Sequence, residues 1–569
     1  MHKKSYQEWL EKVNDAVLLN ELKDMQNNEE EILNSFHKSL EFGTAGLRGI
    51  IGAGTNRMNI YTVGHATQGL AEYVLSVNVN GKVAIAYDSR INSEIFAKKA
   101  ASVLAANNIK VYIYNELMPT PMLSFAVREL KCDAGIVITA SHNPSKYNGY
   151  KAYGKDGCQL GLKESDYVTS IINSVDIFEG VKDCDFNSAL NEGKIEYIGE
   201  EVINSYLNNV LAQSCIDETY NLDELKIIYS PLHGTGNKPV REILKKIGIK
   251  NVKTVKEQEL PDGNFPTVAF PNPEFKETFD LALNMTKDFD ADILLATDPD
   301  SDRVGVAIKN NGTYTLLNGN EIGVLMLNYL LLRKSELGKL PENPIAVKTI
   351  VSTELCKPIC KKYGCALIDV LTGFKFIGEQ ILLLEQKGEE RRFILGFEES
   401  FGYLSGSYVR DKDAVVGSML ICEMVAYFKT KGLNLLQVLE ELYKEFGYYK
   451  NLQHSITCEG ISGMEDMKNA MNNLCNNPPI EINGITVISV NDYNKSVSTN
   501  LVSNTVEKIN LPSSNVLAFE LENKSTVTVR PSGTEPKIKI YVSAVANDEE
   551  SANNLSLTLR DSMIKILGL

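Results

Sequence analysis

Residues 133–151 read DAGIVITASHNPSKYNGYK, an apolar run followed by a polar loop. The apolar half, residues 133–140, is typical of a buried β-strand. In open α/β sheets, ligands bind beyond the carboxyl ends of the strands, which is where Ser141 stands in this pattern. The stretch therefore predicts an α/β sheet with a candidate nucleophile, Ser141, at its ligand-binding edge.

The loop after this strand carries further polar groups that suit acid–base chemistry. His142, Asn143 and Lys151 offer hydrogen-bond donors and a candidate acid or base to one small volume. The alternative is an ordinary serine turn stiffened by Pro144, which needs no ligand.

The alternation of short β-branched runs and helical patterns continues along the chain. Residues 83–87 and 111–114 predict strands with a helix between them, a pattern of α/β units with largely parallel sheets. Further units begin at the strand-like run 225–229, at a helix near Gly319, and after Tyr449, where we expect the last unit to end in paired strands. A chain of 569 residues has room for about four domains.

Composition excludes several classes of partner. The formal net charge of −15 disfavours binding to nucleic acid or to an anionic membrane, because both require a basic face. The opening residues MHKKSYQEWL lack the apolar core of a signal peptide, and residues 1–40 have the spacing of amphipathic helices. The most apolar stretch, residues 322–332, is about half the length of a membrane span, so we expect a buried helix and a cytoplasmic protein. Ten cysteines without a CxxC pair favour reduced thiols.

A second polar loop, residues 298–303, reads DPDSDR and also follows an apolar run. The carboxylates of Asp298, Asp300 and Asp302 would repel one another unless a cation lay between them. All-oxygen ligands suit Mg²⁺, whereas a calcium loop is excluded because Arg303 stands where that loop requires glycine. A solvated acidic loop is the alternative.

Three more loops offer groups for polar ligands. Residues 396–403, GFEESFGY, carry a carboxylate and a hydroxyl that suit vicinal sugar hydroxyls, although an acidic turn would look the same. Residues 530–536, RPSGTEP, have the donors of a phosphate-binding nest, with a plain hairpin turn as the alternative. Residues 42–49, FGTAGLRG, bring glycines and Arg48 together. No GxxxxGK[ST] pattern is present, which disfavours a nucleotide-driven kinase or ATPase.

Together, TASHNP, DPDSDR, GFEESFGY and RPSGTEP occur in the order and spacing of the α-D-phosphohexomutase superfamily, and the chain resembles it over nearly its whole length. GTAGLRG and EESFG resemble the phosphoglucomutase group, and the N-terminal extension resembles the branch that includes phosphopentomutases. The resemblance implies an α/β fold, with three similar α/β domains with mixed sheets and a smaller C-terminal α+β domain around a central cleft. These domains would span residues 1–200, 201–317, 318–448 and 449–569.

The resemblance also implies roles for single residues. Ser141 would be the phosphoserine and would complete a Mg²⁺ site with Asp298, Asp300 and Asp302. Arg48, His142 and Lys151 would act near the reacting phosphoryl group, with Lys151 as the acid or base. The other matched positions would bind the substrate: Arg303, Thr372, Gly373, Glu398, Ser400, Lys412, Arg530, Ser532, Gly533 and Thr534.

These roles imply interconversion of glucose 1-phosphate and glucose 6-phosphate, with glucose 1,6-bisphosphate as intermediate and activator. A phosphopentomutase or a phosphomannomutase is the alternative on the same scaffold. A phosphatase-type hydrolase is disfavoured because the candidate nucleophile is a serine. A non-catalytic sugar-phosphate-binding protein is the alternative from another class. We expect a monomer or homodimer whose partner is a sugar phosphate, with no nucleic acid and no membrane.

Overall fold

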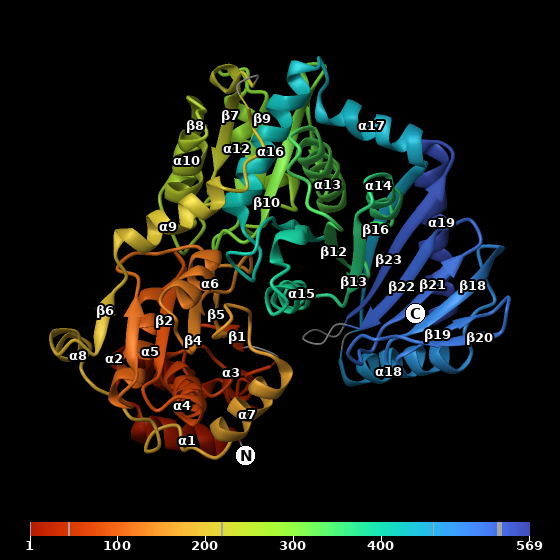
Figure 1. Ribbon diagram of the computed structural model, residues 1–569. Coiled ribbons are helices and arrows are strands. Elements are labelled where there is room, and N and C mark those ends of the chain that lie inside the picture. The colour runs from red at the N-terminus through yellow and green to blue at the C-terminus, as the bar shows by residue number, and fades with distance from the viewer. Residues whose placement is uncertain (1, 44–45, 218–219, 459, 532–536) are drawn as a thin grey trace. The chain divides into compact units, whose positions relative to one another are not determined.

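The computed structural model describes residues 2–43, 46–217, 220–458, 460–531 and 537–569 (Figure 1). The chain divides into two compact units. Unit 1 comprises Met1–Gly319 with Ile377–Gly432, and unit 2 comprises Asn320–Phe376 with Leu433–Leu569. Among the described residues, none of the helices combines the length and the apolar character that a membrane crossing requires.

Unit 1 contains a six-stranded sheet with the order β1-β5-β4-β2-β3-β6. Its strands are β1 (Gly46–Ile50), β2 (Lys82–Tyr87), β3 (Lys110–Ile113), β4 (Ala134–Ile138), β5 (Tyr147–Gly154) and β6 (Ile195–Tyr197). β2 pairs in parallel with β3 and β4, whereas β5 runs antiparallel to both β4 and β1. The predicted strands are confirmed, and β3 also pairs in parallel with β6, so the sheet is mixed with mostly parallel pairings. The antiparallel part arises where a short loop instead of a helix joins β4 to β5.

Helices cover this sheet, and a hydrophobic core lies between them and the strands. They are α4 (Ile60–Val77), α5 (Ser93–Ala106), α6 (Thr120–Glu129), α7 (Leu162–Ile172) and α8 (Phe186–Asn191). α4 begins with a capping box in which the Asn59 side chain accepts from the Thr62 N–H at 3.0 Å. Aliphatic side chains of α4 and α5 pack with those of β2, β3 and β4 in one buried cluster. This packing holds the carboxyl ends of β2 and β4 side by side.

A second sheet in unit 1 has five strands in the order β11-β10-β9-β7-β8. They are β7 (Lys226–Ser230), β8 (Asn251–Thr254), β9 (Ile293–Thr297), β10 (Val304–Asn310) and β11 (Thr313–Leu317), and β7 confirms the strand predicted near 225–229. Its helices are α9 (Glu200–Leu211), α10 (Asn237–Lys246), α11 (Lys256–Glu259), α12 (Asp280–Met285) and α16 (Ala414–Thr430). In both sheets a polar loop joins a buried strand to an antiparallel neighbour. The loop joins β4 to β5 in the six-stranded sheet and β9 to β10 in the five-stranded sheet. The hairpin of β14 (Phe393–Glu398) and β15 (Gly402–Leu404) also belongs to unit 1.

Unit 2 contains the parallel pair β12 (Ile345–Thr349) and β13 (Ala366–Val370), with α14 (Cys356–Lys362). α13 (Gly319–Glu336) begins at the predicted residue, and every residue from Ile322 to Leu331 is buried, which confirms a buried helix. α15 (Lys375–Glu385) leads from unit 2 back into unit 1. α17 (Leu435–Phe446) precedes the last sheet of unit 2.

That sheet has the strand order β16-β23-β22-β21-β18-β19-β20, with β17 paired to β18. The strands are β16 (Tyr448–Thr457), β17 (Glu481–Ile482), β18 (Ile485–Asp492), β19 (Val497–Asn500), β20 (Thr505–Lys508), β21 (Leu517–Leu521), β22 (Thr526–Pro531) and β23 (Lys537–Ala546). Two helices, α18 (Gly460–Asn476) and α19 (Glu549–Leu567), bury their apolar side chains against this antiparallel sheet, an α+β arrangement. The expected strand pair is β22–β23, but the chain does not end there, since α19 follows.

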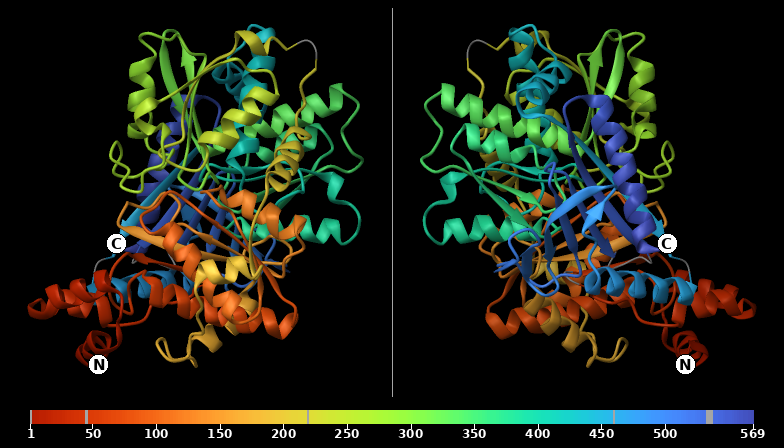
Figure 2. Two further views of the ribbon diagram at one scale, coloured as in Figure 1. Left: turned by 90° about the vertical axis from the view of Figure 1, so that its left-hand side faces the viewer. Right: turned by 90° about the vertical axis from the view of Figure 1, so that its right-hand side faces the viewer.

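The N-terminal extension forms three helices, α1 (His2–Lys12), α2 (Ala16–Asp24) and α3 (Glu29–Phe36), drawn in red in Figure 2. Trp9 is 2 % exposed and meets the rings of Phe36, Tyr61 and Phe178 edge to face at 5.5–5.7 Å between centroids. The extension therefore packs on α4 through an aromatic cluster of its own, and the predicted amphipathic helices are confirmed.

Replacing Trp9 with alanine should lower the free energy of unfolding by about 3–5 kcal/mol, because the cluster loses its central ring. Trp9 is the only tryptophan, so urea unfolding is best followed by circular dichroism. Val17→Ala is the control: Val17 lies on α2 and is 67 % exposed, so its change should stay within about 0.5 kcal/mol. Equal stabilities of the two variants would contradict the packing described here.

Candidate active site

Ser141 follows β4 in a strained conformation. Its φ is +51°, in the left-handed region that serine rarely adopts. Its N–H donates to Thr139 Oγ1 at 2.8 Å, and the residue is 4 % exposed. Strained backbone of this kind clusters at functional sites, since the surrounding structure must stabilise it.

The Ser141 side chain joins the two polar loops of unit 1. Its hydroxyl donates to Asp298 Oδ2 at 2.7 Å, and Oγ lies 3.1 Å from His142 Nδ1. Burial, with the nearby charges of Arg303 and Arg48, lowers the pKa of His142 well below its ordinary value. His142 is therefore a neutral hydrogen-bond partner of Ser141 at neutral pH.

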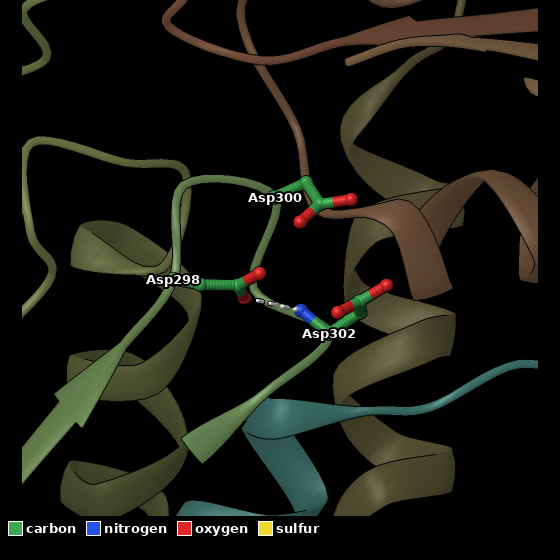
Figure 3. Close-up of side chains that lie close together, drawn as sticks. All are labelled: Asp298, Asp300 and Asp302. Atoms are coloured by element: carbon green, nitrogen blue, oxygen red, sulfur yellow. Dashed lines mark hydrogen bonds between the residues drawn. The ribbon is translucent and has the colours of Figure 1, made fainter. Parts of the chain in front are cut away.

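The carboxylates of Asp298, Asp300 and Asp302 converge on one small volume (Figure 3). Each is buried, and one oxygen from each lies within 4.8 Å of the others. Asp298 Oδ1 accepts the backbone N–H of Asp302 at 3.1 Å and that of Arg303 at 3.0 Å, which fixes the turn. Burial raises the pKa of Asp298 well above its ordinary value, and the two neighbouring carboxylates raise it further. The cluster therefore requires compensating positive charge to ionise fully.

Two lysines supply part of that charge. Lys151 Nζ lies 2.7 Å from Asp300 Oδ2 and 3.4 Å from Asp302 Oδ2. Lys412 Nζ lies 3.1 Å from Asp302 Oδ2 and 3.3 Å from Asp411 Oδ1. Burial acts to lower the pKa of each lysine, but the carboxylates outweigh it and raise both. Both lysines are therefore ammonium groups at neutral pH.

The oxygens left over in this cluster suit a hard cation. Asp300 Oδ1 and Asp302 Oδ1 are buried and have no hydrogen-bond partner among the described residues. A buried carboxylate oxygen without a partner is costly, and a divalent cation with oxygen ligands removes that cost. The three aspartates, with the Ser141 oxygen beside them, fit such an ion.

Glu398, Gly402 and Lys412 are fitted to one another. Glu398 ends β14 and pairs in register with Gly402 of β15. A Cβ atom at Gly402 would come within 2.1 Å of Lys412 Cδ, so this glycine makes room for the lysine stem. Glu398 Oε2 accepts the Ser400 hydroxyl at 3.2 Å, whereas Oε1 is buried and has no hydrogen-bond partner in the described structure. That free oxygen and the Ser400 hydroxyl are available to a polar ligand.

Two arginines border the cluster. Arg48 extends from β1, and its Nη1 donates to Asn143 Oδ1 at 3.4 Å, beside the Ser141 loop. Arg303 Nη1 lies 2.6 Å from Glu274 Oε1, so part of its charge is already paired.

Unit 1 therefore brings together most of the residues predicted from the sequence: Arg48, Ser141, His142, Lys151, Asp298, Asp300, Asp302, Arg303, Glu398, Ser400 and Lys412. Thr372, Gly373 and Arg530 belong to unit 2. Thr372 and Gly373 follow β13, and Arg530 lies in β22 opposite Lys539 of β23. Ser532, Gly533 and Thr534 lie outside the described residues.

Sequence reasoning missed several groups that contact this site. Thr120 Oγ1 donates to Asp300 Oδ2 at 2.8 Å, and Asp411 accepts from Tyr153 at 2.7 Å while pairing with Lys412. Arg90, which follows β2, binds the backbone of the Ser141 loop. Their position in the sequence could have indicated a role at the site for residues 88–90, because they directly follow a parallel strand, as the Ser141 loop does.

Four family models match consecutive parts of the chain. They describe phosphoglucomutase/phosphomannomutase α/β/α domain I (residues 39–177), domain II (204–312), domain III (318–446) and the C-terminal domain (490–557). These matches confirm an α/β fold with three α/β domains and a separate C-terminal domain.

Curated relatives and solved structures agree with these matches. A phosphoglucomutase of Staphylococcus saprophyticus is 37 % identical over 537 residues, which cover 94 % of this chain and 95 % of the relative. A phosphoglucomutase of Staphylococcus aureus is 37 % identical over 540 residues and 94 % of both chains. The open form of parafusin from Paramecium has a TM-score of 0.69 at 16 % identity, covering 93 % of this chain and 96 % of its own. A phosphoglucomutase/phosphomannomutase family protein from Burkholderia thailandensis has a TM-score of 0.66 at 18 % identity, covering 92 % and 97 %.

Replacing Asp302 with asparagine should weaken the binding of a divalent cation at least about tenfold, because one charged ligand oxygen becomes neutral. Calorimetric titration with Mn²⁺ measures the affinity. Asp288→Asn changes an exposed aspartate of the same unit and should leave the affinity within about twofold. If both variants bind Mn²⁺ equally well, the aspartate cluster is not the cation site.

Proposed function

The chain belongs to the phosphoglucomutase/phosphomannomutase family, and we propose that it interconverts glucose 1-phosphate and glucose 6-phosphate. As a member of this family it is a phosphomutase, an isomerase. The observation that carries the proposal is the contact of the strained Ser141 hydroxyl with Asp298 at 2.7 Å, inside a cluster of carboxylates flanked by lysines. The substrate is inferred from relatives that are named phosphoglucomutase and match this chain over nearly their whole length.

Charge neutralisation is the main task of such a site, since phosphoryl transfer depends on positioning and electrostatic stabilisation. Asp298, Asp300 and Asp302 would hold Mg²⁺ together with an oxygen of phosphorylated Ser141. When bound, the ion neutralises charge on the phosphoryl group. Lys151 and Lys412, both protonated, lie against the same aspartates and add positive charge at the site.

In the proposed reaction, the bond between Ser141 Oγ and phosphorus breaks while the free hydroxyl of a hexose monophosphate bonds to the phosphorus. Glucose 1,6-bisphosphate results. Lys151 donates a proton to Ser141 Oγ and takes up the proton that leaves the sugar hydroxyl, so it ends the step as an ammonium group again. The bisphosphate then turns end for end and returns its other phosphoryl group to Ser141. It therefore also serves as the activator that phosphorylates an idle enzyme.

Substrate binding follows the same assignment. Glu398 and Ser400 would bind sugar hydroxyls through the oxygens described above, and Arg303 and Lys412 would also bind the substrate. Arg48 and His142 would contact the transferring group. Thr372 and Gly373 would contact the sugar. The distal phosphate would be bound by Arg530, Ser532, Gly533 and Thr534. In the two half-reactions this phosphate is attached to opposite ends of the sugar.

Several broader predictions remain part of this proposal. They are the four domains at residues 1–200, 201–317, 318–448 and 449–569, a cytoplasmic location, a monomer or homodimer, and the absence of nucleic-acid and membrane partners. Mannose 1-phosphate is an alternative substrate, since the family name covers both glucose and mannose. A pentose phosphate is a further alternative on the same scaffold.

Ser141→Ala should reduce turnover at least about 10³-fold, because the phosphoryl carrier is lost. The assay contains glucose 1-phosphate, Mg²⁺ and a trace of glucose 1,6-bisphosphate, and it follows glucose 6-phosphate. Ser145→Ala, in the same loop, is the matched control and should remain active.

Equal activity of Ser141→Ala and the wild type would refute the phosphoserine scheme. An inactive wild type that turns over mannose 1-phosphate or ribose 1-phosphate would change the sugar and keep the reaction. Tight binding of these sugar phosphates without any turnover would instead favour a binding protein.

A further inference from the structure

We infer that Arg90 is a positioning residue that holds the Ser141 loop in its reactive shape, with Asp88 and Phe265 fixing the arginine itself. This role rests on the proposed function of Ser141. Arg90 and Asp88 have fully buried side chains, so neither contacts a substrate directly.

The guanidinium group of Arg90 binds four backbone carbonyl groups of one loop. Its Nη1 donates to the carbonyl oxygens of Pro144 at 3.0 Å and Tyr147 at 2.9 Å. Its Nη2 donates to the carbonyl oxygen of Ser141 at 2.5 Å and also to that of Asn143. The loop is thus gathered around one planar cation, which offers the donors in a rigid geometry.

Asp88 ties this arrangement to the serine from the other side. One carboxylate oxygen, Oδ2, accepts the Thr139 hydroxyl at 2.6 Å and lies 3.4 Å from Arg90 Nε. The other, Oδ1, accepts the Ser93 hydroxyl at 2.7 Å and the Arg90 N–H at 2.9 Å. Thr139 in turn accepts the N–H of Ser141 at 2.8 Å. Both the N–H and the carbonyl of Ser141 are therefore held through residues 88–90.

Part of the connection between β8 and β9, in the five-stranded sheet, covers Arg90. Phe265 lies in the segment between β8 and β9, and the Arg90 guanidinium carbon is 5.0 Å from the centre of its ring. Phe265 is 2 % exposed, with φ at +48°. Close by, a Cβ atom at Gly263 would lie 2.4 Å from the Ile91 nitrogen, so the segment packs directly on the backbone beside Arg90. A cation–π contact between buried side chains is among the stronger ones.

The consequence is kinetic. Ser141 holds a left-handed backbone, and four carbonyl contacts oppose its relaxation to a more common conformation. A lysine at position 90 would keep the charge but would lack the planar fork, so it would satisfy fewer of the carbonyls. Arg90 does not contact the substrate, but the in-line approach of the substrate to Ser141 depends on the loop shape that Arg90 holds. Loss of the planar fork should therefore lower kcat and leave KM unchanged.

The test compares Arg90→Lys with Arg57→Lys. Arg57 is also a mostly buried arginine that donates to a backbone carbonyl, that of Asn34 at 3.2 Å, but it lies in the N-terminal region. We expect Arg90→Lys to lower kcat about 10–100-fold, with KM within about twofold, because small misplacements of a reacting group have such costs. Arg57→Lys should leave both constants within about twofold.

A single-turnover measurement separates positioning from general damage. Dephosphorylated enzyme is mixed with glucose 1,6-bisphosphate and Mg²⁺, and phosphorylation of Ser141 is followed by quenched-flow mass spectrometry. The rate in Arg90→Lys should fall by the same factor as kcat. If the wild type is not phosphorylated, the proposed function fails; if the wild type and Arg90→Lys are phosphorylated at equal rates, only the role of Arg90 fails.

A milder pair keeps the inference testable if Arg90→Lys does not fold. Phe265→Leu removes the ring over Arg90 and retains an apolar side chain, whereas Phe270→Leu makes the same change at a 51 % exposed position of the same segment. Phe265→Leu should slow Ser141 phosphorylation at least about threefold, with KM unchanged, and Phe270→Leu should not. Equal phosphorylation rates in this pair would overturn the role of the segment and of the arginine it covers.

Discussion

The burial of three carboxylates within 4.8 Å of one another is the constraint on which the site depends. Desolvation and mutual repulsion oppose their ionisation, and the structure compensates with Lys151, Lys412 and Arg303. Lys412 is shared with Asp411, and Arg303 is shared with Glu274, so the compensation from the protein is incomplete. A divalent cation could balance the remaining negative charge, and the buried carboxylate oxygens that lack a hydrogen-bond partner within the described residues would be its ligands.

The two sheets of unit 1 present their polar loops in the same way. Each sends a buried strand into a short polar loop and returns with an antiparallel strand, so that backbone pairing continues while the loop is presented beyond the sheet. The Ser141 loop and the aspartate loop therefore meet although they come from different sheets, and Ser141 Oγ lies 2.7 Å from Asp298 Oδ2. Arg90 and Asp88 hold the Ser141 loop from outside it, whereas the aspartate loop is held from within, because the N–H groups of Asp302 and Arg303 donate to Asp298.

Much of this arrangement could be predicted from the sequence because the motifs follow apolar strands. Ser141 and the aspartates follow such runs, and the carboxyl edge of a sheet is a general place for ligands. Other features depend on partners that no local pattern specifies. Arg90 looks like an ordinary exposed arginine in the sequence, yet its side chain is completely buried. The packing of Ile377–Gly432 with the first 319 residues is also absent from any local pattern, because hydrophobic periodicity identifies a buried face without naming the surface that covers it.

We propose that Ser141 carries the phosphoryl group, and the most direct test is to locate that group after reaction with glucose 1,6-bisphosphate and Mg²⁺. Trypsin releases residues 132–146 as one peptide, which contains Thr139, Ser141 and Ser145. Fragmentation of this peptide in a mass spectrometer distinguishes the three hydroxyl groups. We expect phosphate on Ser141 and on neither Thr139 nor Ser145. Phosphate on Thr139 or Ser145, or an unmodified peptide from an enzyme that turns over, would contradict it.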